Sequence, residues 1–246
     1  LIAPDYLKTE VVKFLQPYVS IPVRVLTADP DYLYLRVDST VQYDPYLTSK
    51  LPNDLKTDVI SGIKDFSTSN LEVFKNDFRY SRFVRSIDNI DASIISNDTS
   101  IELIKRISPY FGIYTDYVIE FNNPGEREGF YDNKAYPDEP CLYSSKFSYV
   151  TIEGVQHDDC YMRDDGLGNL FVYNVINKIT SIINPKAGSI DYNTGFVNLN
   201  KFNALNFDTY ISLYYVPANR DLYAQANKII IIDPSDVTVN IITKRD

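Results

Sequence analysis

The stretch DYLYLRVDSTVQY, residues 31–43, carries the clearest fold signal in the chain. Apolar and polar side chains alternate along it, and successive side chains of a β-strand point to opposite faces of the sheet. We therefore expect a strand with one buried face and one face in water. The positions expected on the buried face are Leu33, Leu35, Val37, Val41 and Tyr43, and those on the other face are Arg36, Asp38, Thr40 and Gln42.

The residues before this strand predict a hairpin partner for it. Over residues 19–25 apolar side chains again alternate, here with polar or proline positions. Asp29, Pro30 and Asp31 then supply the chemistry of a turn. We therefore expect two paired strands here. The apolar positions of the first are Val19, Ile21, Val23 and Val25.

Two helices should cover the buried face of this sheet. From Pro52 to Phe66 apolar residues recur at helical spacing, and a second such segment follows the start of the motif FRYSRF, residues 78–83. The segment from Ala92 to Leu103 returns as a strand or strand pair, with a turn or bulge at Ser96 to Asp98. This order predicts a small two-layer ββααβ module, a sheet with helices on one face. The apolar helix positions are Leu55, Val59, Ile63 and Phe66, then Tyr80, Phe83, Val84 and Ile87.

Glycine marks the boundary to a different architecture. Of the nine glycines only Gly62 precedes residue 110, and the segments beyond it are short and rich in β-branched and aromatic residues, as is typical of strands. We expect an α+β protein with an N-terminal helix in residues 1–17, the module in 18–109 and a mainly β domain in 110–246. The helix, Pro4 to Leu15, should dock on the module or continue an upstream region. The expected strands are 114–121, 142–152, 170–176, 210–216, 228–232 and 237–243, with turns at Asn193 to Gly195 and Asp233 to Ser235.

The chain is acidic, with a net charge of -9. The excess lies in residues 110–246, which carry 18 acidic and 11 basic residues. A nucleic-acid partner requires clustered cations that displace counterions, so protein partners are favoured. No apolar run approaches the roughly 20 residues that span a bilayer. Cys141 and Cys160 could form a disulfide, but free buried thiols are favoured, which indicates synthesis in a reducing cytoplasm. The first residue, Leu1, indicates a piece of a longer protein.

No arrangement of residues predicts an enzyme, a cofactor or a metal site. His157 to Cys160 includes metal-binding residue types, but the chain has no second histidine and no CxxC pair. The segment from Asp164 to Asn169 lacks the alternating oxygen donors and the closing glutamate of an EF-hand, so a β-turn is favoured there. Two carboxylate pairs could serve a glycosidase only at a set separation, and solvated loop acids are the favoured interpretation. These pairs are Glu126 with Glu128, and Asp158 with Asp164.

Residues 18–103 resemble the baseplate J-like module of contractile-tail phages. The resemblance lies in the order of the elements: a hairpin, an Asp-Pro corner at Asp44 and Pro45, a helix, and then DFRYSRFVRSIDNID, residues 77–91. The whole chain resembles the C-terminal part of the baseplate wedge proteins of T-even phages. The resemblance implies a structural subunit of a virion tail baseplate that forms a homodimer and a ring, binds other wedge proteins and rearranges when the tail contracts. It implies no cofactor, no nucleic-acid partner and no direct membrane contact.

Two groups of residues are candidate contacts. Arg79, Arg82 and Arg85 lie off the apolar face of the second helix, either as a solvated flank or as partners of carboxylates or of another subunit. Ile229, Ile230, Ile231 and Ile232 form a strand that is buried on both faces or lies at an interface. The 21 tyrosines suit core packing, protein interfaces and carbohydrate platforms alike. The alternative function is therefore a receptor- or saccharide-binding β module of a tail protein, with or without hydrolytic activity.

Overall fold

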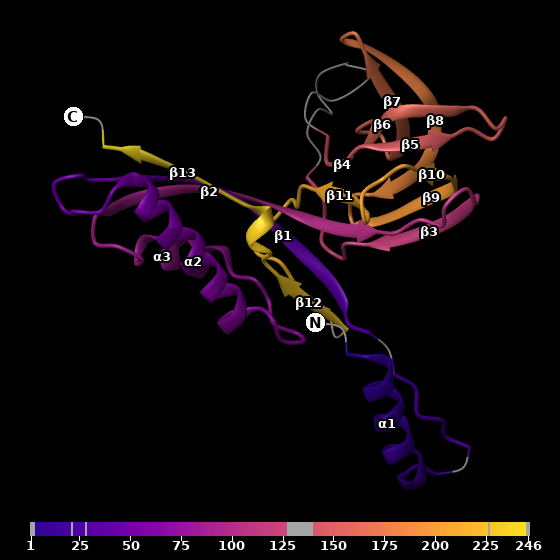
Figure 1. The fold of residues 1–246 in the computed structure, drawn as a ribbon, viewed down its shortest axis with the longest axis horizontal. Helices are drawn as coiled ribbons and strands as arrows, with labels where there is room; N and C mark the ends of the chain where they lie inside the picture. Colours follow the sequence, from indigo (N-terminus) through magenta and orange to yellow (C-terminus); the bar gives the residue numbers. More distant parts are fainter. Residues whose placement is uncertain (1–2, 21, 28, 127–139, 226, 245–246) are drawn as a thin grey trace.

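The computed structural model describes residues 3–20, 22–27, 29–126, 140–225 and 227–244 of the 246-residue chain. Within that part the protein is mixed α+β, with three α-helices and one sheet of thirteen strands. The sheet runs through two lobes, one of which carries two of the helices while the other is built almost wholly of strands (Figure 1). None of the described helices is long and apolar enough to cross a membrane.

Strand β1, Asp31–Tyr43, is central to the helical lobe and confirms the predicted alternation. All five apolar positions expected on its inner face are buried, while the positions between them are partly exposed. Ser39 falls on the inner face as well. Its hydroxyl lies 2.8 Å from that of Thr99 on the neighbouring strand, so the polar group is buried with a hydrogen-bond partner.

Both edges of β1 are occupied, and the predicted hairpin is therefore wrong. β2, Ile94–Ile107, pairs antiparallel with one edge. β12, Lys228–Ile231, and β13, Val237–Thr243, pair parallel with the other edge. No edge remains for residues 19–25, whose described members form no strand, and Pro22 has no N–H to donate to a ladder. The lobe has the order β1, α2, α3, β2 and is completed by two strands from the end of the chain.

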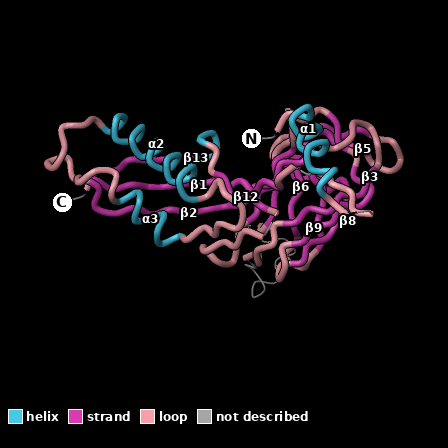
Figure 2. Tube along the Cα trace, turned by 90° about the horizontal axis from the view of Figure 1, so that it is seen from below, coloured by secondary structure: helices cyan, strands magenta, loops and turns pink. Residues whose placement is uncertain are grey.

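The two predicted helices form. α2, Pro52–Asn70, packs against β13, and α3, Tyr80–Asp88, packs against β2 and against α2 (Figure 2). Proline suits the first turn of α2, where its missing N–H needs no partner, and the Asp54 carboxylate accepts a hydrogen bond from the Leu51 N–H at 3.4 Å. The rings of Phe66, Phe78 and Phe83 lie with centroids 5.1 to 6.4 Å apart in the core between the helices and the sheet.

The irregularity predicted at Ser96 to Asp98 lies slightly earlier. These residues are part of β2, and the register of the β1–β2 ladder shifts where Gln42 pairs with Ser96 and Tyr43 pairs with Ile94. Asn97 pairs with Val41 in this ladder, and its side-chain amide donates to the Asp88 carboxylate, at 2.7 Å, at the end of α3. The strand and the helix end are thereby held together.

The second lobe is built mainly of strands, although two strands of the predicted β domain, β12 and β13, belong to the helical lobe instead. β11, Ile211–Tyr215, joins it to the helical lobe by pairing with β2 on one edge and with β4, Leu142–Ser144, on the other. The tight turn at Asn193 to Gly195 is confirmed, since β8, Ile179–Asp191, and β9, Phe196–Phe202, pair on either side of it and Gly195 has a φ of 71°. The long strand β6 was not predicted. The remaining strands are β3, Thr115–Glu120; β5, Phe147–Val150; β6, Gln156–Asp164; β7, Asn169–Ile176; and β10, Ala204–Leu205.

The domain boundary after residue 109 stays a prediction. β12 and β13 lie beyond it in the sequence yet share a sheet with β1. The buried apolar side chains of the two lobes also belong to one core cluster. Any division of the chain into domains must therefore assign β12 and β13 to the same domain as β1.

Helix α1, Asp5–Leu15, forms as predicted but does not dock on the module. None of its residues is buried, and it projects from the body of the protein (Figure 1). The chain after it returns alongside. The Gln16 amide donates to the Val23 carbonyl at 3.1 Å, and the Lys8 ammonium pairs with the Asp29 carboxylate at 2.7 Å. We call α1 and the segment that returns beside it, residues 16–29, the arm.

Candidate assembly surfaces

The predicted contact residues Arg79, Arg82 and Arg85 are exposed along α3 and the residue before it. Phe83 and Ile87 occupy the opposite, buried face of the same helix. Because residues three apart share a side of a helix, the three guanidinium groups are brought to one side of α3. Their role in an interface stays a prediction.

Arg79 is held within the chain by acidic residues. Its guanidinium lies 3.3 Å from Asp77 and 3.2 Å from Asp221, and it stacks over the ring of Tyr223. The hydrogen bond to Asp221, then the one to Tyr223, raises the pKa of Arg79. Asp221 also accepts a hydrogen bond from the Tyr80 N–H at 2.8 Å, at the start of α3. Arg79 therefore fastens the loop around residue 221 to the helix.

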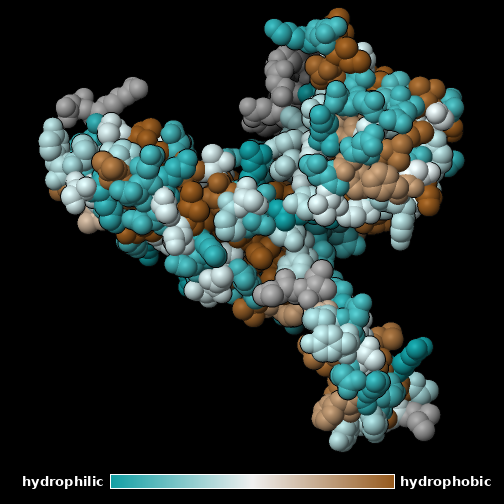
Figure 3. Space-filling view, in the orientation of Figure 1, coloured by the Kyte–Doolittle hydropathy of each residue, from teal (hydrophilic) through white to brown (hydrophobic). Residues whose placement is uncertain are grey.

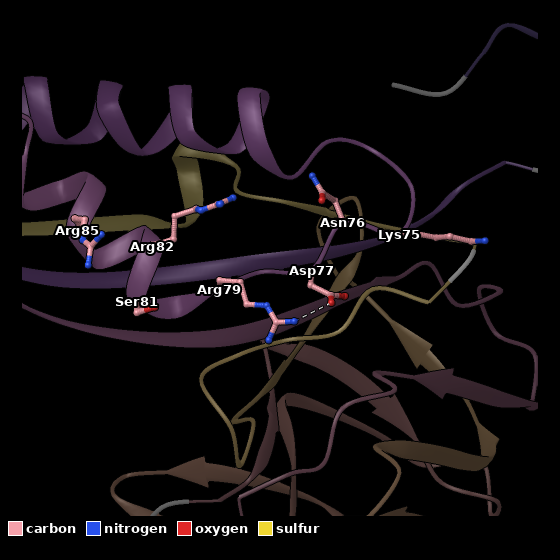
Figure 4. Close-up of a pocket in the computed structure, with 7 residues that line it drawn as sticks. All are labelled: Lys75, Asn76, Asp77, Arg79, Ser81, Arg82 and Arg85. Atoms are coloured by element: carbon pink, nitrogen blue, oxygen red, sulfur yellow. Dashed lines mark hydrogen bonds and ion pairs between the residues drawn. The ribbon is translucent and has the colours of Figure 1, made fainter.

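A basic hollow of about 610 Å³ lies beside α3 (Figure 4). Its lining holds four cations and one carboxylate, Asp77, which is paired with Arg79. Arg82 extends from the helix on one side, and Asn76 stands on the preceding loop on the other. Among the described residues, no ion pair is formed by Arg82, Arg85 or Lys75. The lining residues are Lys75, Asn76, Asp77, Arg79, Ser81, Arg82 and Arg85.

The isoleucine run lies inside the fold. Ile229, Ile230 and Ile232 are buried, and Ile231 is partly exposed. Its strand, β12, pairs with residues 31–34 of β1. Of the two interpretations left open by the sequence, this placement favours a strand buried on both faces.

A buried charge cluster joins β1, β2 and β12. The side chains of Lys105 and Lys228 are 8% and 1% exposed, and both ammonium groups bind the Asp31 carboxylate. Burial lowers the pKa of Lys105 to about 8, and the hydrogen bond to Asp31 opposes this shift. Lys228 also donates to the carbonyl of Glu120 at 3.0 Å. The Asp31 carboxylate is thus shared by two buried cations, and the Glu120 carboxylate lies 4.0 Å from Lys228 as a second, more distant partner.

A second charged clamp surrounds Arg106. Its guanidinium lies 4.0 Å from the ring centre of Tyr34 and 4.7 Å from that of Tyr210. It also pairs with Asp236 at 2.6 Å and with Asp233 at 3.4 Å. Sequence reasoning missed both clusters, although two adjacent cations, Lys105 and Arg106, at the end of an apolar strand are a signal that buried partners exist.

The acidic residues considered as metal-binding or catalytic candidates have structural roles. Asp158 is exposed on β6, whereas Asp164 is buried and accepts hydrogen bonds from the Leu142 N–H and the Tyr192 hydroxyl at 2.8 and 2.7 Å. The segment from Asp164 to Asn169 is the turn between β6 and β7, closed by the Asp165 carboxylate. No metal-binding group of acidic, histidine or cysteine side chains occurs in the part of the chain that the structure describes. Glu128 lies outside the described residues.

Both cysteines are free and buried, as predicted. Burial raises the pKa of the Cys160 thiol to about 11 and that of Cys141 further. A thiol with a raised pKa holds little of the reactive thiolate at neutral pH. The two cysteines are therefore core residues.

Exposed apolar side chains lie on two projections, the arm and the tip of the β7–β8 hairpin, as well as on several loops (Figure 3). The arm exposes one stripe of α1 at helical spacing. The hairpin tip turns at Asn177 and Lys178, which both have positive φ. Neither projection is covered by the described part of the chain. The exposed residues are Leu7, Val11, Phe14 and Leu15 on the arm, and Val175, Ile176, Ile179 and Ile182 on the hairpin.

Part of this chain matches a known protein family. Residues 31–106 match the family model of the baseplate structural protein gp6, C-terminal domain III. The matched region runs from the start of β1 almost to the end of β2, so it contains α2, α3 and the basic hollow. The class of protein that this match supports is the baseplate structural protein.

A similarity to an individual protein agrees with it. Over 116 residues, 47% of this chain, the sequence is 21% identical to the baseplate wedge protein gp6 of Enterobacteria phage T4. The alignment spans 17% of that relative's length. Together the two matches support a baseplate wedge protein family and a location in the tail baseplate of a virion. They suggest a structural role. The finer resemblance to the baseplate J-like module stays a prediction.

Proposed function

We propose that this chain is a structural subunit of a phage-tail baseplate wedge, which associates with itself and binds other wedge proteins to build a ring. The observation that carries the proposal is the family match over residues 31–106, because it covers the whole unit of β1, α2, α3 and β2. Two uncovered apolar projections support it, since apolar surface that stays exposed on a free chain favours association.

The proposed mechanism is mechanical. The buried clusters around Asp31 and Arg106 tie strands from both ends of the chain together, so each lobe keeps its internal fold. Contacts between subunits then rearrange when the sheath contracts. The arm is suited to such a contact because none of α1 is buried against the body.

Sedimentation velocity of the chain over a range of concentrations tests self-association. We expect a species larger than the monomer that grows with concentration. Replacing Phe14 by Glu, on the exposed stripe of the arm, serves as a probe of one contact. A strict monomer at the highest concentration reached would overturn self-association of this chain.

The alternative function, saccharide binding by the β lobe, has one observation in its favour. Tyr110, Phe111 and Tyr114 are exposed close together in the sequence, and aromatic faces are suited to stacking on sugars. Against it, Tyr149 and Tyr215 are core residues. Binding to a glycan array that is lost when Tyr110 and Tyr114 are replaced by Ala would favour this alternative over the assembly role.

A further inference from the structure

We propose that the basic hollow beside α3 binds a carboxylate-rich segment of a partner protein, with Lys75, Arg82 and Arg85 supplying the charge. The inference rests on the proposed assembly function, since it names the chemistry of one subunit contact. It also separates the arginines predicted as a group. Arg79 is already paired with Asp77 and Asp221, which leaves the other two for a partner.

Three of the four cations in the hollow have no carboxylate partner within the described part of the chain. The chain has 33 acidic residues against 24 basic ones, yet Lys75, Arg82 and Arg85 line one hollow without an ion pair in the described part of the chain. Arg82 and Arg85 are three residues apart on one helix, where like charges repel and weaken the helix slightly. Lys75 has a φ of 62°, a backbone conformation that favours glycine or asparagine. An added carboxylate would relieve the repulsion.

Asp221 is an internal precedent for the proposed ligand. Although it is 142 residues away in the sequence, its carboxylate binds Arg79 and the Tyr80 N–H beside the hollow. The planar guanidinium groups of Arg82 and Arg85 can donate to further carboxylates, each through two parallel N–H groups. The side chains of Ser81 and Asn76 add neutral hydrogen-bonding groups to the lining.

The occupant is a peptide segment rather than a nucleic acid. Residues 75–85 supply the whole lining, so the positive charge is local, whereas a phosphate backbone requires a stripe of cations that follows it. The net charge of -9 also opposes a polyanion that extends over the rest of the surface. A short run of Asp or Glu side chains fits both constraints.

The test measures binding of a fluorescein-labelled hexaglutamate peptide to the full chain by anisotropy at low ionic strength, where surface charges are least screened. We expect saturable binding that the double variant R82E/R85E weakens by about tenfold or more. The matched control is K56E/K64E, which changes the net charge equally at two exposed positions of α2 outside the hollow. It should bind within about twofold of the wild type.

Several results would overturn the proposal. They are an absence of peptide binding, equal weakening by the two double variants, and binding of an oligothymidylate of similar charge as tight as that of the peptide.

Co-assembly with the other wedge proteins separates the test of the hollow from the test of the assembly function. If R82E/R85E, folded by circular dichroism, joins the wedge as the wild type does, the hollow is no assembly contact while the assembly function stands. If the wild type joins no wedge protein, the assembly function fails. The peptide experiment then decides only whether the hollow binds carboxylates.

Discussion

Asp31 and Asp38 lie on the same strand with nearly equal side-chain exposure, 40% and 39%, but they neutralise different charges. Asp31 binds two buried lysines, whereas Asp38 lies 3.4 Å from the partly exposed Arg36. We predict that Asp31→Asn lowers the free energy of unfolding by about 2 kcal/mol or more, because removing one partner leaves buried charge uncompensated. Asp38→Asn, the control, should cost less than about 1 kcal/mol. Urea denaturation measures both, and equal losses would contradict the assigned role of Asp31.

Asp91, in the motif SIDNID, predicts a dependence of stability on acid. The hydrogen bond from Lys50, followed by those from the Ser93 backbone and hydroxyl, lowers the pKa of Asp91 from 3.8 to about 2. The ionised group therefore stabilises the fold above pH 3.8, and this contribution is lost as the pH falls towards about 2.

Thermal unfolding followed by circular dichroism across this pH range checks the prediction. The melting temperature of the wild type should fall more steeply than that of Asp91→Asn, which has no carboxylate to protonate. Asp65→Asn, at an exposed position of α2, should follow the wild type. Parallel curves for the wild type and Asp91→Asn would show that the Lys50 contact contributes nothing.

At the scale of elements, α3 carries core residues and surface residues next to each other in the sequence. Phe83 is fully buried against Phe66 and Phe78, while Arg82 beside it is exposed. We predict that Phe83→Ala costs about 3–5 kcal/mol through lost burial and the cavity left behind. Arg82→Ala should stay within about 0.5 kcal/mol of the wild type. Chemical denaturation distinguishes these values, and a large effect of Arg82→Ala would make it a folding residue.

The elements also show how far sequence patterns reach. Alternation in β1 and helical spacing in α2 and α3 were sufficient to predict those elements, because such patterns follow from local geometry. Residues 19–25 alternate equally well but form no strand in their described part, since the edge of β1 they required is taken by β12 and β13. The parallel pairing of these strands joins residues far apart in the sequence, as in Asp31 with Lys228, and no local pattern encodes it.

The candidate site shows the same limit. The off-face position of the three arginines followed from the spacing in FRYSRF, but the separation of Arg79 from the other two depends on Asp221. That carboxylate lies in the loop between β11 and β12, which is far from α3 in the sequence. The buried partners of Lys105 and Arg106 are likewise brought together by strands that are distant in the sequence.

At the scale of the whole molecule, the predicted module of residues 18–109 lacks two strands that occupy one edge of β1. We therefore predict that a fragment of residues 18–109 is largely unfolded or aggregates, because an unpaired hydrophobic edge is exposed. The matched control supplies residues 227–244 as a separate peptide, which should restore helical circular dichroism and protect amides of β1 from exchange. A fragment that folds cooperatively alone would instead support the predicted boundary at residue 109.

The assembly function is tested most directly by mixing the purified full chain with the other wedge proteins of its phage and following the mixture by sedimentation velocity and electron microscopy. The proposal predicts that the chain enters a discrete wedge complex, that baseplate-like rings or arcs form only when it is present, and that it sediments with them. A chain that remains separate from every wedge protein, with wedges that form equally well without it, would contradict the central claim.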